Sequence, residues 1–169
     1  WMTVKDEDAR ANLRHAATSA GIPPDRLVFA APTDRPTYFS RLALADLALD
    51  TFPYGAGTMA SDAVWTGLPT VTMSGDTFAS RMCASVLAAC GVEDTVATTI
   101  EDYEKIALTL AKDPAAMTAL RHRIVSSKHQ SGLFSPKQFV SYLGRAYEQA
   151  IQRAQTGLSF DHIRISDQK

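Results

Sequence analysis

The stretch Asp50–Pro69, "DTFPYGAGTMASDAVWTGLP", joins an apolar run to a helix-like run through a loop that holds two glycines. The residues before it, "DLALD" at 46–50, are short and apolar and predict a buried strand. Residues Thr58–Thr66 have helical spacing, and Gly67 predicts where that helix ends. A strand that passes through a glycine loop into a helix is typical of α/β proteins.

The same alternation of strands and helices continues on both sides of this stretch. We expect strands at Leu27–Ala30, Leu47–Asp50 and Thr70–Met73, a weaker strand at Thr95–Ala97, and helices at about 5–20, 58–66, 77–89, 100–112, 114–127 and 136–155. The strands are apolar throughout, which is typical of a parallel sheet with helices on both faces. We therefore predict an α/β fold with one domain over residues 1–157 and a tail over 158–169.

Charge and composition disfavour several classes of function. The chain of 169 residues carries 17 Lys and Arg against 18 Asp and Glu, and it has no basic run. This balance gives no electrostatic footprint for a nucleic-acid backbone or an anionic membrane surface. Asp46, Asp50 and Asp62 break the apolar stretches, which stay shorter than the roughly 18 residues of a membrane span. We expect neither nucleic acid nor membrane among the partners.

The cysteines and histidines indicate the compartment and the metal content. Cys83 and Cys90 are seven residues apart in a helical pattern, so both lie on one face and a mutual disulfide is disfavoured. We interpret them as reduced core thiols and expect a cytoplasmic protein. The four histidines have no acidic or cysteine partner at ligand spacing, so no metal is expected.

The glycine loop has the features of a phosphate site. Gly55 and Gly57 allow a close approach of the backbone, and the Thr58 hydroxyl and the amides of Thr58 and Met59 can donate to phosphate oxygens. Asp62 follows Thr58 by four residues, so it lies on the same helix face about 5.4 Å further along. That separation suits a nucleoside diphosphate whose ribose hydroxyls donate to the carboxylate.

The pattern by itself leaves a second interpretation open. The glycines would then make only a turn, Thr58 would cap the helix, and Asp62 would be a solvated polar residue. Neither the three-glycine dinucleotide fingerprint nor the lysine-containing phosphate loop is present, so a dehydrogenase and a P-loop hydrolase have no support. Two further residues have structural interpretations: we expect Asp76 to be the N-cap of the helix that follows it and Trp65 to pack in the core beneath the loop.

Several motifs stand in a fixed order between residues 45 and 91. They are "LDT", the spacing from it to Asp62, "W-x-G-x-P-x-V-T-M" and "G-D-T-x-A-S-R" at Gly75–Arg81. With them, the run "ADLALDTFPYGAGTMASDAVWTGLPTVTMSGDTFASRMCASVLAACG" resembles the C-terminal catalytic half of the O-linked N-acetylglucosamine transferases, including the SPINDLY-like branch. A weaker similarity extends from "PPDRLVF" to "SGLFSPKQFVSYLGRAYEQA" and so covers most of the chain.

The resemblance implies the C-terminal, Rossmann-like donor-binding half of a two-domain GT-B glycosyltransferase. The full-length enzyme would transfer N-acetylglucosamine from UDP-GlcNAc to Ser or Thr of proteins, with no metal cofactor. The chain opens with Trp1 and a charged "KDEDAR" run, so we expect a fragment with further residues before it. The isolated fragment is expected to be inactive, since the family's N-terminal half and helical repeats, which help to recognise the protein acceptor, are absent.

Two alternatives to this function stay open. One is a related transferase with another donor or acceptor, such as UDP-glucose onto asparagine. The other is a noncatalytic module that binds nucleotide sugars.

The resemblance also assigns individual residues. Thr58 matches a threonine that contacts the phosphates, and Asp62 matches the aspartate that binds ribose. Arg35 falls where the family has a lysine near the nucleotide, Tyr38 falls where it has a histidine, and the backbone near Thr33 would meet the uracil edge.

The chain departs from the family at the phosphate loop. Gly57-Thr58-Met59 replaces the usual His-Thr-Thr, which removes an imidazole and a hydroxyl while the backbone donors remain. No general base is visible, so the catalytic residues stay unassigned. The helix-terminal amides and a cation such as Arg35 would stabilise the departing diphosphate.

Overall fold

The computed structural model describes residues 4–128 and 130–165 of the chain, so residues 166–169 of the expected tail lie outside the described residues. The chain divides into two compact units, residues 1–44 and 45–169. The single domain over residues 1–157 stays a prediction. No helix within the described ranges combines the length and the apolar character needed to cross a bilayer.

The described residues of the first unit form two α-helices and one 3-10 helix. They are α1 (Glu7–Ser19), the 3-10 helix η1 (Pro24–Arg26) and α2 (Arg35–Ala43). The Asp6 carboxylate caps α1 by accepting the Ala9 N–H at 2.7 Å. Pro36 lies in the first turn of α2, where its missing N–H leaves no helical hydrogen bond unmade.

The strand expected at Leu27–Ala30 does not form, and this prediction is wrong. Phe29 alone makes an isolated bridge, and Val28 is 58% exposed. A strand needs a backbone paired over several residues and a buried face, whereas here a single residue is paired and none of the four is fully buried. The Phe29 ring instead lies near two guanidinium groups of α1, 5.7 Å from Arg10 and 4.9 Å from Arg14.

The second unit contains a three-stranded parallel sheet. Its strands are β1 (Ala48–Leu49), β2 (Thr70–Met73) and β3 (Val96–Ala97), in the order β1-β2-β3. The register pairs Ala48 with Thr70 and Thr72 with Val96. The ladder continues one residue past β1, where the Asp50 N–H donates to the Val71 carbonyl at 2.9 Å. The predicted α/β fold with a parallel sheet is confirmed.

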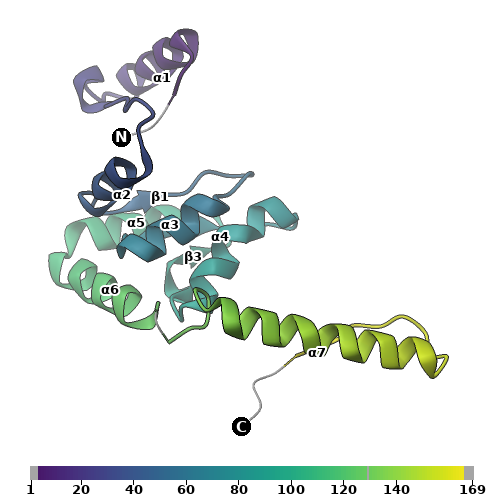
Figure 1. Cartoon of the computed structure of the whole chain (residues 1–169). Helices are drawn as coiled ribbons and strands as arrows, with labels where there is room; N and C mark the ends of the chain where they lie inside the picture. The colour runs from purple at the N-terminus through teal and green to yellow at the C-terminus, as the bar shows by residue number, and fades with distance from the viewer. Residues whose placement is uncertain (1–3, 129, 166–169) are drawn as a thin grey trace. The chain divides into compact units, whose positions relative to one another are not determined.

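Helices connect and cover these strands, as Figure 1 shows. They are α3 (Thr58–Thr66), α4 (Phe78–Ala89), the 3-10 helix η2 (Glu93–Thr95), α5 (Ile100–Lys112), α6 (Pro114–Ser127) and α7 (Pro136–Gln155). Helix α3 joins β1 to β2, α4 joins β2 to β3, and both α4 and α5 pack against the central strand β2. The bounds of α3, α5, α6 and α7 agree with the predicted ones.

The main core lies between α3, α4 and α6. Its buried side chains form one cluster: Ala60, Val64, Cys83, Leu87, Cys90, Val92, Leu120 and Ile124. Both cysteines are buried and free, as expected. The Arg121 guanidinium on α6 also donates to the Ala45 carbonyl at 2.6 Å, which ties α6 to the chain entering β1.

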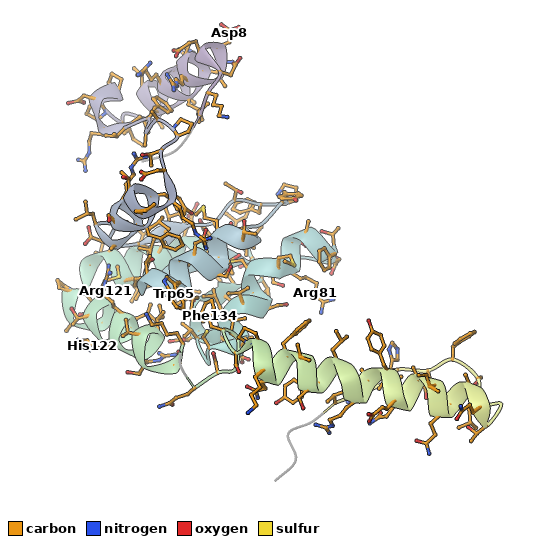
Figure 2. The ribbon with its side chains drawn as sticks, viewed as in Figure 1. Asp8, Trp65, Arg81, Arg121, His122 and Phe134 are labelled. Atoms are coloured by element: carbon orange, nitrogen blue, oxygen red, sulfur yellow. The ribbon has the colours of Figure 1, made fainter. Side chains whose placement is uncertain are left out.

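Trp65 lies outside this core, so the prediction that it packs beneath the loop is wrong. It is 48% exposed, and its ring meets the Phe134 ring edge-on at 5.2 Å (Figure 2). The Lys128 ammonium lies 5.1 Å from the Trp65 ring and donates to the Trp65 carbonyl at 2.9 Å. Because Val64 occupies the buried face of α3, the next residue is rotated about 100° toward the surface.

The N-cap of α4 is Thr77, so the prediction that Asp76 caps this helix is wrong. The Thr77 hydroxyl accepts the Ser80 N–H at 3.2 Å, and the Ser80 hydroxyl accepts the Thr77 N–H at 3.1 Å. This reciprocal pair is a capping box, which requires the cap three residues before Ser80. Asp76 is one residue too early and is exposed.

Two glycines with positive φ give a matched test of how closely α3 and α6 pack. Gly67 ends α3 with φ +75°, and a Cβ placed there would lie 2.7 Å from Val125 on α6. Gly91 has φ +65°, and a Cβ there would meet nothing within 4 Å. Gly91→Ala should lower the free energy of unfolding by about 1–2 kcal/mol through backbone strain alone. Gly67→Ala should lower it by at least about 1 kcal/mol more, because of the added overlap.

Urea unfolding of both variants measures this difference. Adding Val125→Ala to Gly67→Ala should recover most of the excess loss. Equal losses for the two glycine variants would contradict the packing that the structure assigns to α3 and α6.

Candidate functional site

The loop after β1 is organised around the buried carboxylate of Asp50. This residue is 5% exposed. Its Oδ1 accepts the N–H groups of Thr51 at 2.9 Å and Ala56 at 2.8 Å, and its Oδ2 accepts the Thr72 hydroxyl of β2 at 2.7 Å. The Thr51 hydroxyl also donates to the Tyr54 carbonyl at 2.9 Å, which closes the turn. The loop is therefore tied both to itself and to the sheet.

Gly55 seats the loop against the start of α4. Its N–H donates to the Ala79 carbonyl at 3.2 Å. A Cβ at this position would lie 3.1 Å from the Asp50 Oδ2 and 3.2 Å from the Ala79 oxygen, which is tighter than ordinary contact. Glycine is required here because the Asp50 carboxylate and the Ala79 carbonyl lie so close, and not because of a positive φ.

Helix α5 contacts the same loop through Tyr103. The Tyr103 hydroxyl donates to the Asp50 carbonyl at 2.8 Å, and its ring meets the Phe52 ring edge-on at 5.6 Å. Burial, together with the negative charge of Asp50, raises the pKa of Tyr103 to about 12. The phenol therefore stays protonated and remains a donor at neutral pH.

The first turn of α3 presents backbone donors to solvent. Gly57, rather than Thr58, is the N-cap, and it provides no side-chain hydrogen bond to the helix. The Ala60 N–H donates to the Gly57 carbonyl at 3.1 Å. Thr58 and Met59 are exposed, and their N–H groups belong to the helix positions that have no intrahelical acceptor. These donors and the positive end of the helix dipole suit an anion.

Asp62 lies one turn into α3 and is half-buried. Within residues 4–128 and 130–165, its carboxylate has no hydrogen bond or ion pair to the protein. The structure thus brings Gly57, Thr58, Met59 and Asp62 together on one helix end. Their roles toward a nucleotide stay predictions.

The other three predicted site residues belong to the first unit. The Thr33 hydroxyl donates to the Asp34 carboxylate at 3.2 Å. Arg35 begins α2, and its guanidinium lies 5.3 Å from the Phe39 ring, which also meets the Tyr38 ring edge-on at 5.5 Å. Thr33 and Arg35 are exposed, and Tyr38 is half-buried. Their contacts with uracil and nucleotide likewise stay predictions.

Sequence reasoning missed the residues that hold the loop in place. Asp50, Thr72 and Tyr103 received no role, and Gly55 was expected to allow a close approach of the backbone to a phosphate, not to Asp50 and Ala79. One signal was present: Asp50 is a carboxylate at the end of an apolar strand, where burial demands several hydrogen-bond donors. Neither the sequence spacing nor the residue type identifies Thr72 and Tyr103 as its partners.

Comparison with known proteins gives matches over most of the chain. A family model described as Glycosyl transferase family 41 matches residues 1–143. A Caenorhabditis elegans protein named UDP-N-acetylglucosamine–peptide N-acetylglucosaminyltransferase is 31% identical over 163 residues, which cover 96% of this chain and 14% of that protein. A Hordeum vulgare protein named as a probable enzyme of the same kind, SPINDLY, is 34% identical over 105 residues, or 62% of this chain and 11% of that protein.

A solved structure is also similar. It is that of a Thermobaculum terrenum O-GlcNAc transferase mutant, with a TM-score of 0.83 and 30% sequence identity over 90% of this chain and 30% of that one. The chain therefore spans less than a third of each of these relatives. The matches confirm the resemblance that the motifs of residues 45–91 indicate.

The Cys83 thiol predicts how stability depends on pH. Burial, and after it the charge of Asp50, raises the pKa of Cys83 from 9.0 to about 12. Between these values the unfolded chain loses the thiol proton and the folded chain keeps it, so rising pH favours unfolding. The contribution is present in full below about pH 9 and is lost as pH rises toward 12.

Urea unfolding between pH 8 and 11 tests this effect. The wild type should lose stability more steeply than Cys83→Ala, by up to about 1.4 kcal/mol per pH unit, because only the wild type carries this titration. All other titrating groups are shared by the two proteins. Identical slopes would show that the thiol is not shielded as the structure indicates.

Proposed function

The chain belongs to glycosyl transferase family 41, and we propose that it binds the UDP-sugar in an enzyme that transfers N-acetylglucosamine from UDP-GlcNAc to Ser or Thr of proteins. The observation that carries this proposal is the first turn of α3. There, Thr58 and Met59 are exposed, and their amides lie at the start of the helix. The carboxylate of Asp62 lies one turn further along and has no partner in the described part of the protein.

The spacing along α3 fits the parts of a nucleoside diphosphate. The pyrophosphate would accept hydrogen bonds from the amides and from the Thr58 hydroxyl at the start of the helix. The ribose would lie about 5.4 Å further along, one turn into the helix, where both of its hydroxyls donate to Asp62. Arg35, Tyr38 and the backbone near Thr33 remain proposed contacts of the nucleotide and its base.

Transfer forms a bond between an acceptor oxygen and the anomeric carbon of the sugar, and it breaks the bond from that carbon to the β-phosphate. The departing UDP gains negative charge, which the helix-terminal amides would stabilise. With Arg35 as a cation, this arrangement needs no metal. The proposal assigns activation of the acceptor hydroxyl to residues outside this chain.

The proposal places the chain within a longer protein. Acceptor recognition would come from an N-terminal GT-B half and from helical repeats, since this chain spans only part of its relatives. The cytoplasm is the proposed compartment because Cys83 and Cys90 are both free thiols.

One observation favours a second candidate, a module that binds nucleotide sugars without transferring them. Gly57 and Met59 stand where the resembling family has His and Thr, so the imidazole and one hydroxyl are missing from the phosphate loop. Another donor or acceptor, such as UDP-glucose and asparagine, is the remaining alternative.

Transfer assays separate these candidates. The full-length protein, incubated with labelled UDP-GlcNAc and a protein acceptor, should label Ser or Thr, whereas the isolated 169-residue chain should bind UDP weakly and transfer nothing. Preference for UDP-glucose or labelling of asparagine would establish the alternative enzyme. Binding without turnover for any UDP-sugar would establish the noncatalytic module, and sustained transfer by the isolated chain would contradict the division of roles.

Replacement of Asp62 tests the site itself. Asp62→Ala removes charge-assisted hydrogen bonds worth roughly 1.5–3 kcal/mol each, so UDP affinity should fall at least about tenfold. Uridine affinity should fall by a similar factor, because the lost contacts are to ribose. Calorimetry on the full-length protein measures both values.

Two controls accompany this experiment. Glu148→Ala removes the same charge from an exposed position of α7 and should leave UDP affinity unchanged. A 2′,3′-dideoxyribose analogue of UDP should bind the wild type weakly and should lose little more in Asp62→Ala. Unchanged UDP affinity in a folded Asp62→Ala protein would identify Asp62 as a solvated helix residue.

A further inference from the structure

We propose that Asp50 is a positioning residue for nucleotide-sugar binding, which holds loop 51–57 so that the first amides of α3 stay directed toward a pyrophosphate. This inference rests on the proposed function of that loop. Asp50 acts through the loop and not by contact with the ligand, because both of its carboxylate oxygens already accept hydrogen bonds from the protein.

One carboxylate oxygen fixes the distance between the two ends of the loop. The Asp50 Oδ1 accepts the N–H of Thr51, the first loop residue, and the N–H of Ala56, which directly precedes the N-cap Gly57. Two amides five residues apart in sequence therefore meet at a single atom. The path of the chain into α3 is set by this pair of hydrogen bonds.

The other oxygen and the neighbouring carbonyl attach the loop to the rest of the unit. The Asp50 Oδ2 accepts the Thr72 hydroxyl of β2, and the Asp50 carbonyl accepts the Tyr103 hydroxyl of α5. From the side of α4, the Gly55 N–H donates to the Ala79 carbonyl. The loop is thus held by a strand and by two helices.

The N-cap of α3 makes this support necessary. A side chain at an N-cap usually accepts a helix amide and orders the entry into the helix, but Gly57 has none. Order in the loop must then come from contacts made by other residues. A loop fixed before the ligand arrives avoids the cost of ordering it on binding, and this raises affinity for the group that the loop contacts.

The loop requires hydrogen-bond acceptors at position 50 but does not require a charge there. In Asp50→Asn, the amide oxygen can accept the Thr51 and Ala56 N–H groups, and the amide nitrogen can donate to the Thr72 hydroxyl. Asp50→Ala leaves all three donors without a partner. Helix α3 should keep its place in both variants, because Ala60 and Val64 anchor it in the core.

Comparison of UDP with uridine isolates the effect on the phosphate site. In the full-length protein, Asp50→Ala should weaken UDP binding at least about tenfold and change uridine affinity by less than about twofold, while Asp50→Asn stays within about threefold of wild type for both ligands. Ile124→Ala, which removes a buried core side chain on α6, is the control for lost stability and should leave the ratio of UDP to uridine affinity unchanged. Circular dichroism confirms that each variant is folded.

Thr72→Val supplies a second test if Asp50→Ala does not fold. It removes one donor to the carboxylate and should weaken UDP about threefold or more, again with little change for uridine. Equal changes for UDP and uridine, or none, in the folded variants would overturn the positioning role. A wild-type protein that binds no UDP, or binds it no better than uridine, would overturn the proposed function first and this inference with it.

Discussion

The hydrogen bonds of one buried residue, Asp50, organise the second unit. Asp50 extends the β1–β2 ladder through its N–H, reaches Thr72 on β2 through its side chain, and meets Tyr103 on α5 through its carbonyl. Removing a carboxylate from water costs several kcal/mol unless its oxygens accept hydrogen bonds in return. Two amides and a hydroxyl supply them here. The loop conformation is therefore a condition for burying Asp50, and the burial in turn keeps the loop in that conformation.

Helix α3 has one face buried in the core and another face with some solvent exposure. Its buried residues, Ala60, Ala63 and Val64, are small, which allows close packing against α4 and α6. Thr58 and Asp62, four residues apart, lie on one other face and keep some solvent exposure. A helix fixed by its apolar face can present a polar face with little freedom to move, and a ligand site requires that combination.

Much of this arrangement could be predicted from the sequence, for physical reasons. The run Thr58–Thr66 ends at a glycine with positive φ, and helices 100–112 and 114–127 carry caps or a first-turn proline, so local chemistry defines their ends. The prediction of a strand at Leu27–Ala30 was wrong because an apolar run becomes a strand only when another strand pairs with it, and pairing depends on residues distant in sequence. The predictions for Trp65 and Asp76 were each wrong by one residue. A rotation of about 100° along the helix decides whether Trp65 is buried, and a shift of one position decides which residue caps α4.

The predicted ligand residues on α3 followed from spacing, whereas the residues that support them did not. Phosphate contact at Thr58 and Met59 would need only a helix start. The support comes from Asp50, directly before the loop, through its partners Thr72 and Tyr103, which are distant in sequence. With glycine at position 57, the loop has neither an imidazole nor a capping side chain. Apart from the Thr58 hydroxyl, the proposed donors are therefore backbone amides, whose directions depend on the path of the chain. The helix dipole contributes roughly half a positive charge, which does not balance the negative charge of a pyrophosphate. In the proposed site a cation would supply the rest, and Arg35 is the residue proposed for it, so phosphate binding there would depend on the path of the loop and on that arginine.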